Sequence, residues 1–167
     1  GEPVRLAPGI EAEFTGAGHI LGAASVILRL GEPGAQRTLV FSGDLGPWDM
    51  PILEDPQPPA GADYLVIEST YGDRDHDPPR EVPEALARVV RETVAAGGNL
   101  VIPSFSVERT QDLLYHLNLL HGQGRVPDLP VFVDSPMAIK VTEVFARHPE
   151  LFDEEARALL AEGRHPC

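Results

Sequence analysis

The sequence predicts an α/β protein in which a β-rich first part is followed by strands that alternate with helices. Three observations support this fold class. Short runs of β-branched and apolar residues are separated by glycine-bearing turns over the first third of the 167 residues. Apolar residues then recur at helical spacing in two later segments, and apolar runs with the length of buried strands lie beside those segments.

The first part has the pattern of neighbouring strands joined by short turns. Apolar and β-branched residues cluster at residues 11–15, 24–30 and 37–41, with glycines between the clusters. Residues 47–62 are crowded with Pro, Gly and Asp, so we expect a surface connection there. A further buried strand is expected at residues 64–67, and it ends directly before Glu68.

The second part alternates between helices and strands. A first helix, followed by the stop signal Gly97-Gly98, is predicted by apolar residues at helical spacing, namely Val82, Leu86, Val89, Val90 and Val94. Strands are expected at residues 100–102 and 131–133, and between them lies a second helix whose apolar side carries Leu113, Leu114, Leu117 and Leu120. Further helical segments are expected after Pro136 and Pro149. Strands that alternate with helices indicate a doubly wound parallel sheet.

The charge of the chain is strongly acidic, with 26 acidic against 13 basic residues and a formal net charge of −13. This balance argues against a nucleic-acid binder built on a basic face. Two features weaken the argument: a metal site needs acidic residues, and bound divalent cations would offset part of the local charge. Lys140 is the only lysine, and arginine, which makes up the other basic residues, is the better fork for phosphate.

Cysteine usage and hydropathy bear on location. The single cysteine, Cys167, can form no internal disulfide, so nothing indicates an oxidising compartment. No apolar run approaches the roughly 18 residues of a membrane helix, and residues 1–9 lack the pattern of a signal peptide. We therefore expect a soluble protein with a cytoplasmic location and no membrane partner.

Three short motifs each place a polar residue shortly after an expected strand. Gly16-Ala17-Gly18-His19 follows the first strand, and a neutral imidazole in that position is a good zinc ligand. The stretch FSGDLG places Asp44 between two glycines, and ESTYGDR begins with Glu68, followed by the hydroxyls of Ser69 and Thr70, which suit phosphate. Taken singly, each is more often a turn or capping residue than a site residue.

Taken together, the three motifs predict a site at one edge of a sheet. His19 and Asp44 would supply an imidazole and a carboxylate to a metal, and Glu68 would orient a neighbouring group. Metal-assisted hydrolysis requires a carboxylate that can bridge two cations and an acid that orients a proton donor. The sequence thus favours a metal-dependent hydrolase.

Five blocks in order give a resemblance to a known family: GAGHILGAAS, FSGDLG, ESTYGDR, PSFSVERTQDLLYHL and PVFVDSPMA. They resemble the β-CASP branch of the metallo-β-lactamase superfamily, which includes RNA-cleaving enzymes. The resemblance implies that His19 is a zinc ligand and that Asp44 bridges two zincs. It matches Glu68 to the family's motif A acid, which contacts the histidine thought to protonate the leaving group.

The same resemblance implies a fold in two parts. Residues 1–72 match the C-terminal part of a metallo-β-lactamase αββα half, and residues 73–167 match the start of a doubly wound parallel β-CASP domain. In the family, that domain forms the other wall of the substrate cleft. The resemblance therefore implies further substrate contacts by four residues: Ser104, Arg109, Asp134 and Ser135. His76 lies near motif A, where a role in the cleft is also expected.

The chain departs from the family pattern at both ends of the site. It has no His-x-His-x-Asp-His stretch, which supplies most zinc ligands in the family, and no residues that match the later histidine motifs B and C. We therefore expect an internal piece of a larger enzyme, with two ligands and no activity by itself. Exposed strand edges lead us to expect association with further copies.

The function implied for the parent enzyme is hydrolysis of RNA phosphodiester bonds by two zinc ions, with single-stranded DNA as a second substrate class. Two alternatives stay open. One is a hydrolase of small esters, thioesters or lactams in the same superfamily. The other is a non-catalytic partner subunit of a nuclease complex, against which the presence of both His19 and Asp44 argues.

Overall fold

The computed structural model describes residues 1–32, 34–74 and 81–167. The chain divides into two compact units, Gly1–Arg74 and Asp75–Cys167. The boundary between the two family domains, expected between residues 72 and 73, stays a prediction. Each unit is described by itself.

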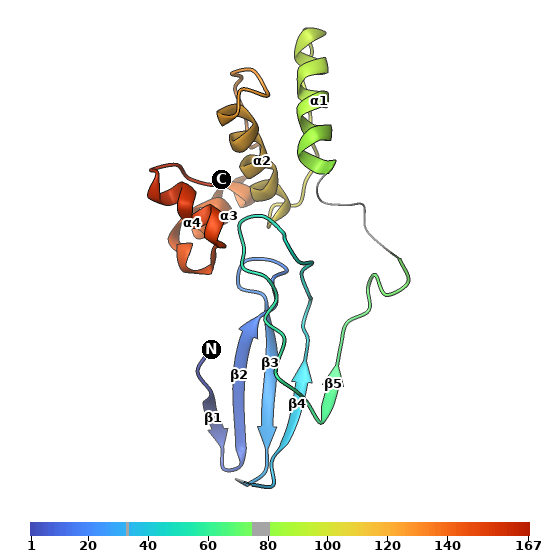
Figure 1. Ribbon diagram of the computed structural model, residues 1–167, viewed down its shortest axis with the longest axis vertical. Helices are drawn as coiled ribbons and strands as arrows, with labels where there is room; N and C mark the ends of the chain where they lie inside the picture. The colour runs from blue at the N-terminus through green and yellow to red at the C-terminus, as the bar shows by residue number, and fades with distance from the viewer. Residues whose placement is uncertain (33, 75–80) are drawn as a thin grey trace. The chain divides into compact units, whose positions relative to one another are not determined.

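The first unit is built on a five-stranded sheet with the order β1-β2-β3-β4-β5 (Figure 1). Its strands are β1 (Val4–Ala7), β2 (Ile10–Gly16), β3 (Ala24–Leu30), β4 (Arg37–Phe41) and β5 (Tyr64–Val66). The pairs from β1 to β4 are antiparallel, and β5 joins β4 in parallel. Strands are thus confirmed at the predicted positions 11–15, 24–30, 37–41 and 64–67, whereas β1 was not predicted. The expected burial of the strand at 64–67 is wrong, because β5 lies at the edge of the sheet and its residues are exposed.

The central strands carry the buried side of this unit. Ala12 of β2, Ile27 of β3 and Val40 of β4 are all buried. The connection over residues 47–62 was expected on the surface, but its Ile52 and Leu53 are buried as well. The Ile52 backbone takes a φ of 76°, which lets the turn direct this apolar side chain inward. The connection therefore contributes to the core of the unit.

The second unit is helical in its described residues. Its helices are α1 (Val82–Ala95), α2 (Arg109–Gly122), α3 (Pro136–Arg147) and α4 (Glu154–Ala161), with a 3-10 turn η2 (Pro149–Leu151). Each lies where the sequence predicts a helical segment, and α1 ends before Gly97, whose φ is 67°. No helix in the described ranges is both long enough and apolar enough to cross a membrane.

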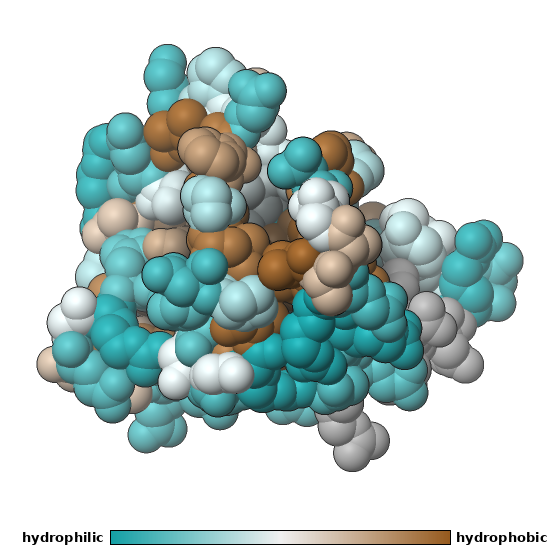
Figure 2. Space-filling model, turned by 90° about the horizontal axis from the view of Figure 1, so that it is seen from above, coloured by the Kyte–Doolittle hydropathy of each residue, from teal (hydrophilic) through white to brown (hydrophobic). Residues whose placement is uncertain are grey.

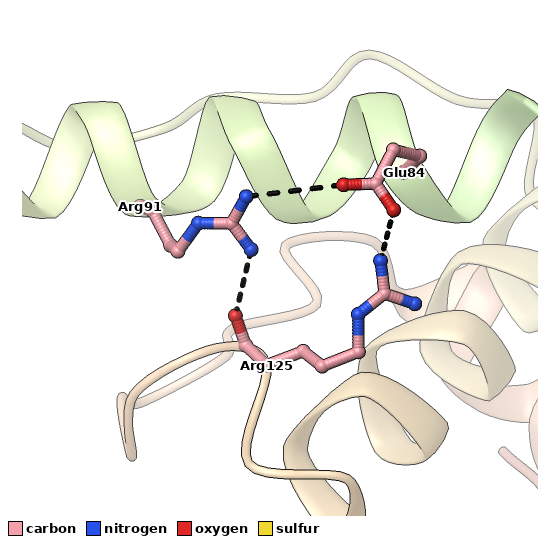
Figure 3. A network of polar contacts seen from close by, with 3 residues as sticks. All are labelled: Glu84, Arg91 and Arg125. Atoms are coloured by element: carbon pink, nitrogen blue, oxygen red, sulfur yellow. Dashed lines mark hydrogen bonds and ion pairs between the residues drawn. The ribbon is translucent and has the colours of Figure 1, made fainter.

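Helices α1 and α2 share a small apolar core made of Ala87, Val90, Leu120 and Val126. A polar network crosses the same contact (Figure 3). In it Glu84 of α1 forms ion pairs with Arg91 and with Arg125, while the Arg91 guanidinium donates a hydrogen bond of 3.0 Å to the Arg125 carbonyl oxygen. The loop after α2 is thereby attached to α1 at its first turn, through Glu84, and in its second half, through Arg91.

The strands expected at residues 100–102 and 131–133 do not form, and this part of the prediction is wrong. All strands among the described residues belong to the first unit, so the doubly wound parallel sheet expected for the second unit is not formed there. Val101 and Phe132 are 84% and 85% exposed. A strand needs a neighbour that takes up its hydrogen bonds, and neither segment has one. Apolar residues accordingly reach the surface in patches on the face drawn in Figure 2.

Candidate active site

The ends of three strands meet at one edge of the sheet. Gly16, the last residue of β2, pairs with Ala24 at the start of β3. Because β4 is antiparallel to β3 and parallel to β5, its end at Phe41 lies next to Val66, the end of β5. The loops that carry His19, Asp44 and Glu68 all leave the sheet from this edge.

The loop of Asp44 lies directly against the loop of His19. The Gly46 N–H donates a hydrogen bond of 2.8 Å to the Ala17 carbonyl oxygen. A Cβ atom on Gly46 would lie 1.8 Å from the Gly18 carbonyl oxygen and 2.7 Å from the His19 nitrogen. Only glycine permits this approach, so the second glycine of FSGDLG determines how closely the two loops pack.

Glu68 connects the third loop to the second. One of its carboxylate oxygens accepts a hydrogen bond of 2.9 Å from the Leu45 N–H, and the other accepts one of 3.2 Å from the Thr70 N–H. The Leu45 N–H is the largest cause that lowers the pKa of Glu68, followed by Thr70, with a smaller electrostatic contribution from His19. The carboxyl group is therefore held in its ionised form next to the Asp44 loop.

The two candidate metal ligands are open to solvent. His19 and Asp44 are exposed, as are Ser69 and Thr70, while Glu68 is half-buried. An imidazole and a carboxylate are donors that zinc accepts, so both side chains fit positions in a zinc site. Among the described residues, no group of three or more His, Cys, Asp or Glu side chains could hold a metal ion.

The candidate substrate contacts of the second unit lie at the beginnings of α2 and α3. The Ser104 hydroxyl is 2.9 Å from that of Thr110. The Ser135 hydroxyl accepts a hydrogen bond from the Ala138 N–H and so caps α3, and it lies 3.3 Å from the Ser106 hydroxyl. The two sequence blocks are thus adjacent, and their charged members, Arg109 and Asp134, are exposed. His76 lies outside the described residues.

Comparison of the sequence with known proteins identifies its family. Residues 110–166 match the model of the Beta-Casp domain. A ribonuclease of Thermus thermophilus is 41% identical over 166 residues, which cover 99% of this chain and 37% of the relative. The chain belongs to the β-CASP family. The match to the β-CASP domain begins directly after Arg109, the first residue of α2, and ends beyond α4, so it includes Asp134 and Ser135.

Further relatives are named for different activities. The transcription termination factor FttA of Methanosarcina mazei is 32% identical over 170 residues, covering 99% of this chain and 26% of the relative. The endoribonuclease ysh1 of Schizosaccharomyces pombe is 29% identical over 152 residues, covering 90% of this chain and 19% of the relative. The chain thus spans about a third or less of the length of these relatives.

Two serines that the sequence analysis did not single out lie beneath the candidate site. Ser25 is 4% exposed and Ser42 is 5% exposed, and both hydroxyls form hydrogen bonds around the loop of Asp44. A signal was present for Ser42, because a small polar residue directly follows the apolar strand end at Phe41. Periodicity alone cannot show which neighbour such a hydroxyl contacts.

Proposed function

We propose that the full-length protein containing this chain hydrolyses RNA phosphodiester bonds with the help of zinc. One observation supports this most: an imidazole, a carboxylate and a second, ionised carboxylate leave the sheet at one edge, on loops that hydrogen bond to each other. The similarity to a ribonuclease and to an endoribonuclease supports RNA as the substrate. Single-stranded DNA is the second substrate class to test.

In this proposal His19 and Asp44 are zinc ligands. Bound zinc would supply a Lewis acid that lowers the pKa of a water molecule and offsets charge on the phosphate. Two protein ligands make a weak site, so the remaining ligands come from other residues of the full-length protein or from water. We therefore also propose that the isolated chain of 167 residues is inactive. Metal-dependent RNA cleavage by the isolated chain, lost in His19→Ala, would contradict this.

The remaining polar residues would act on the substrate and on the loops. Glu68 holds the Leu45 and Thr70 N–H groups and so supports the Asp44 loop, in addition to the motif A role that the family implies. Exposed hydroxyls and a guanidinium suit phosphate oxygens, and the residues proposed for these contacts are Ser69, Thr70, Ser104 and Arg109. Asp134 and Ser135, at the start of α3, are further residues proposed to contact RNA.

The test uses the full-length protein and a labelled single-stranded RNA oligonucleotide. We expect cleavage that stops when zinc is chelated and that is abolished in His19→Ala and in Asp44→Ala. The control variants are His121→Ala and Asp128→Ala, which change the same residue types at exposed positions near the end of α2. Cleavage that survives in both site variants would refute the proposal, and turnover of a chromogenic lactam without RNA cleavage would favour the alternative hydrolase.

A further inference from the structure

The Ser42 hydroxyl lies between two of the loops that form the candidate site. It donates a hydrogen bond of 2.6 Å to the Gly43 carbonyl oxygen, and it accepts one of 3.0 Å from the Glu68 N–H. The Ser42 N–H also donates to the Val66 carbonyl oxygen at 2.9 Å. Ser42 therefore extends the pairing of β4 with β5 beyond the last residues of both strands.

Together with Glu68, this serine holds the chain on both sides of Asp44. Two residues before Asp44, the Ser42 hydroxyl is bound to the Glu68 main chain. One residue after Asp44, the Leu45 N–H is bound to the Glu68 carboxylate. A segment of four residues is thus attached at both ends to one residue of the neighbouring strand end, with the exposed Asp44 side chain between the attachments.

The backbone around Ser42 leaves this segment little freedom to move. Gly43 has a φ of 59°, and a Cβ atom there would lie 2.8 Å from the Ala24 carbonyl oxygen. One residue earlier in the chain, the Ser42 carbonyl oxygen accepts a hydrogen bond of 2.7 Å from the buried Ser25 hydroxyl. The backbone of Ser42 and Gly43 is thus held against β3. The Ser42 hydroxyl makes a separate connection, from the Asp44 loop to the Glu68 N–H.

We propose that Ser42 is a positioning residue, which acts through Glu68 and the Asp44 loop to hold the Asp44 carboxylate in its ligand position. The inference rests on the proposed function for the identity of the metal. Alanine at position 42 would leave the Glu68 N–H and the Gly43 carbonyl oxygen without their partner, so the loop would adopt other conformations. Residues that orient metal ligands typically change metal affinity roughly ten- to a hundredfold when they are replaced.

The experiment compares three variants of the full-length protein: Ser42→Ala, Ser42→Thr and Thr142→Ala. Threonine keeps the hydroxyl and is suited to a strand end. Thr142→Ala is the matched control, because the Thr142 hydroxyl also donates one hydrogen bond to a carbonyl oxygen and accepts one, but both of its partners, Ala138 and Gln111, lie on helices of the second unit. The measurements are zinc affinity by competition with a chelating dye, the melting temperature, amide hydrogen exchange of Glu68, and kcat and KM on the RNA oligonucleotide.

The expected result is a zinc affinity roughly ten- to a hundredfold lower in Ser42→Ala, with faster exchange of the Glu68 amide and a lower kcat at an unchanged KM. Ser42→Thr restores these values, and Thr142→Ala keeps both the zinc affinity and the exchange rate of the Glu68 amide. Wild-type zinc affinity in Ser42→Ala, equal losses in both alanine variants, or a wild-type protein without zinc would overturn the inference. Zinc binding with this pattern but no RNA cleavage by the wild type would instead overturn the proposed function alone.

Discussion

The contact between the Asp44 and His19 loops can be tested with the substitution Gly46→Ala. The added methyl group would lie 1.8 Å from the Gly18 carbonyl oxygen, whereas ordinary contacts begin at 3.4 Å. The atoms that the methyl group would meet belong to the backbone of Gly18 and His19, so no side chain can move aside. The two loops would have to separate, and the hydrogen bond from Gly46 to Ala17 would lengthen. Overpacking of this kind costs about 1–3 kcal/mol of the free energy of unfolding. A displacement of about 1 Å at the reacting groups is expected to lower activity on the order of 100-fold.

The assay is chemical denaturation of the full-length protein, followed by circular dichroism, together with RNA cleavage. Gly61→Ala is the matched control, because a Cβ atom there meets nothing within 4 Å. Its free energy of unfolding should stay within about 0.5 kcal/mol of the wild type. If Gly46→Ala is as stable and as active as Gly61→Ala, the two loops do not pack as described and the reasoning fails.

Two further predictions concern the second unit. Burial raises the pKa of Asp112 to about 6 from 3.8, so ionisation of this carboxyl group opposes folding. The free energy of unfolding should therefore fall by about 3 kcal/mol as the pH rises from about 4 to about 6. Asp112→Asn should therefore raise the melting temperature at pH 7 and leave it unchanged near pH 4, whereas equal melting curves at pH 7 would contradict the burial argument. Glu84→Ala removes the exposed ion pairs to Arg91 and Arg125 and should cost less than about 1 kcal/mol at low salt and almost nothing in 1 M NaCl. A larger loss that persists in salt would show that the network does more than pair exposed charges.

Local pattern predicted much of the fold. The run of apolar and β-branched residues at 24–30 predicted a strand, and the helical spacing from Val82 to Val94 predicted a helix, because both signals come from neighbours along the chain. The same reasoning failed at residues 100–102 and 131–133, whose apolar runs suggested strands. A strand exists only if a second segment pairs with it, and that partner is not encoded in the run itself.

For the candidate site, the sequence by itself determined which residues leave the strand ends, namely His19, Asp44 and Glu68, and the motifs around them pointed to the β-CASP family. Tertiary structure alone decided how those strand ends are joined. The approach of Gly46 to the His19 loop, the use of both Glu68 carboxylate oxygens, and the place of the Ser42 hydroxyl became visible only there. The physical reason is that such hydrogen bonds depend on the pairing and register of β2, β3, β4 and β5, which bring together residues up to 26 positions apart in the chain.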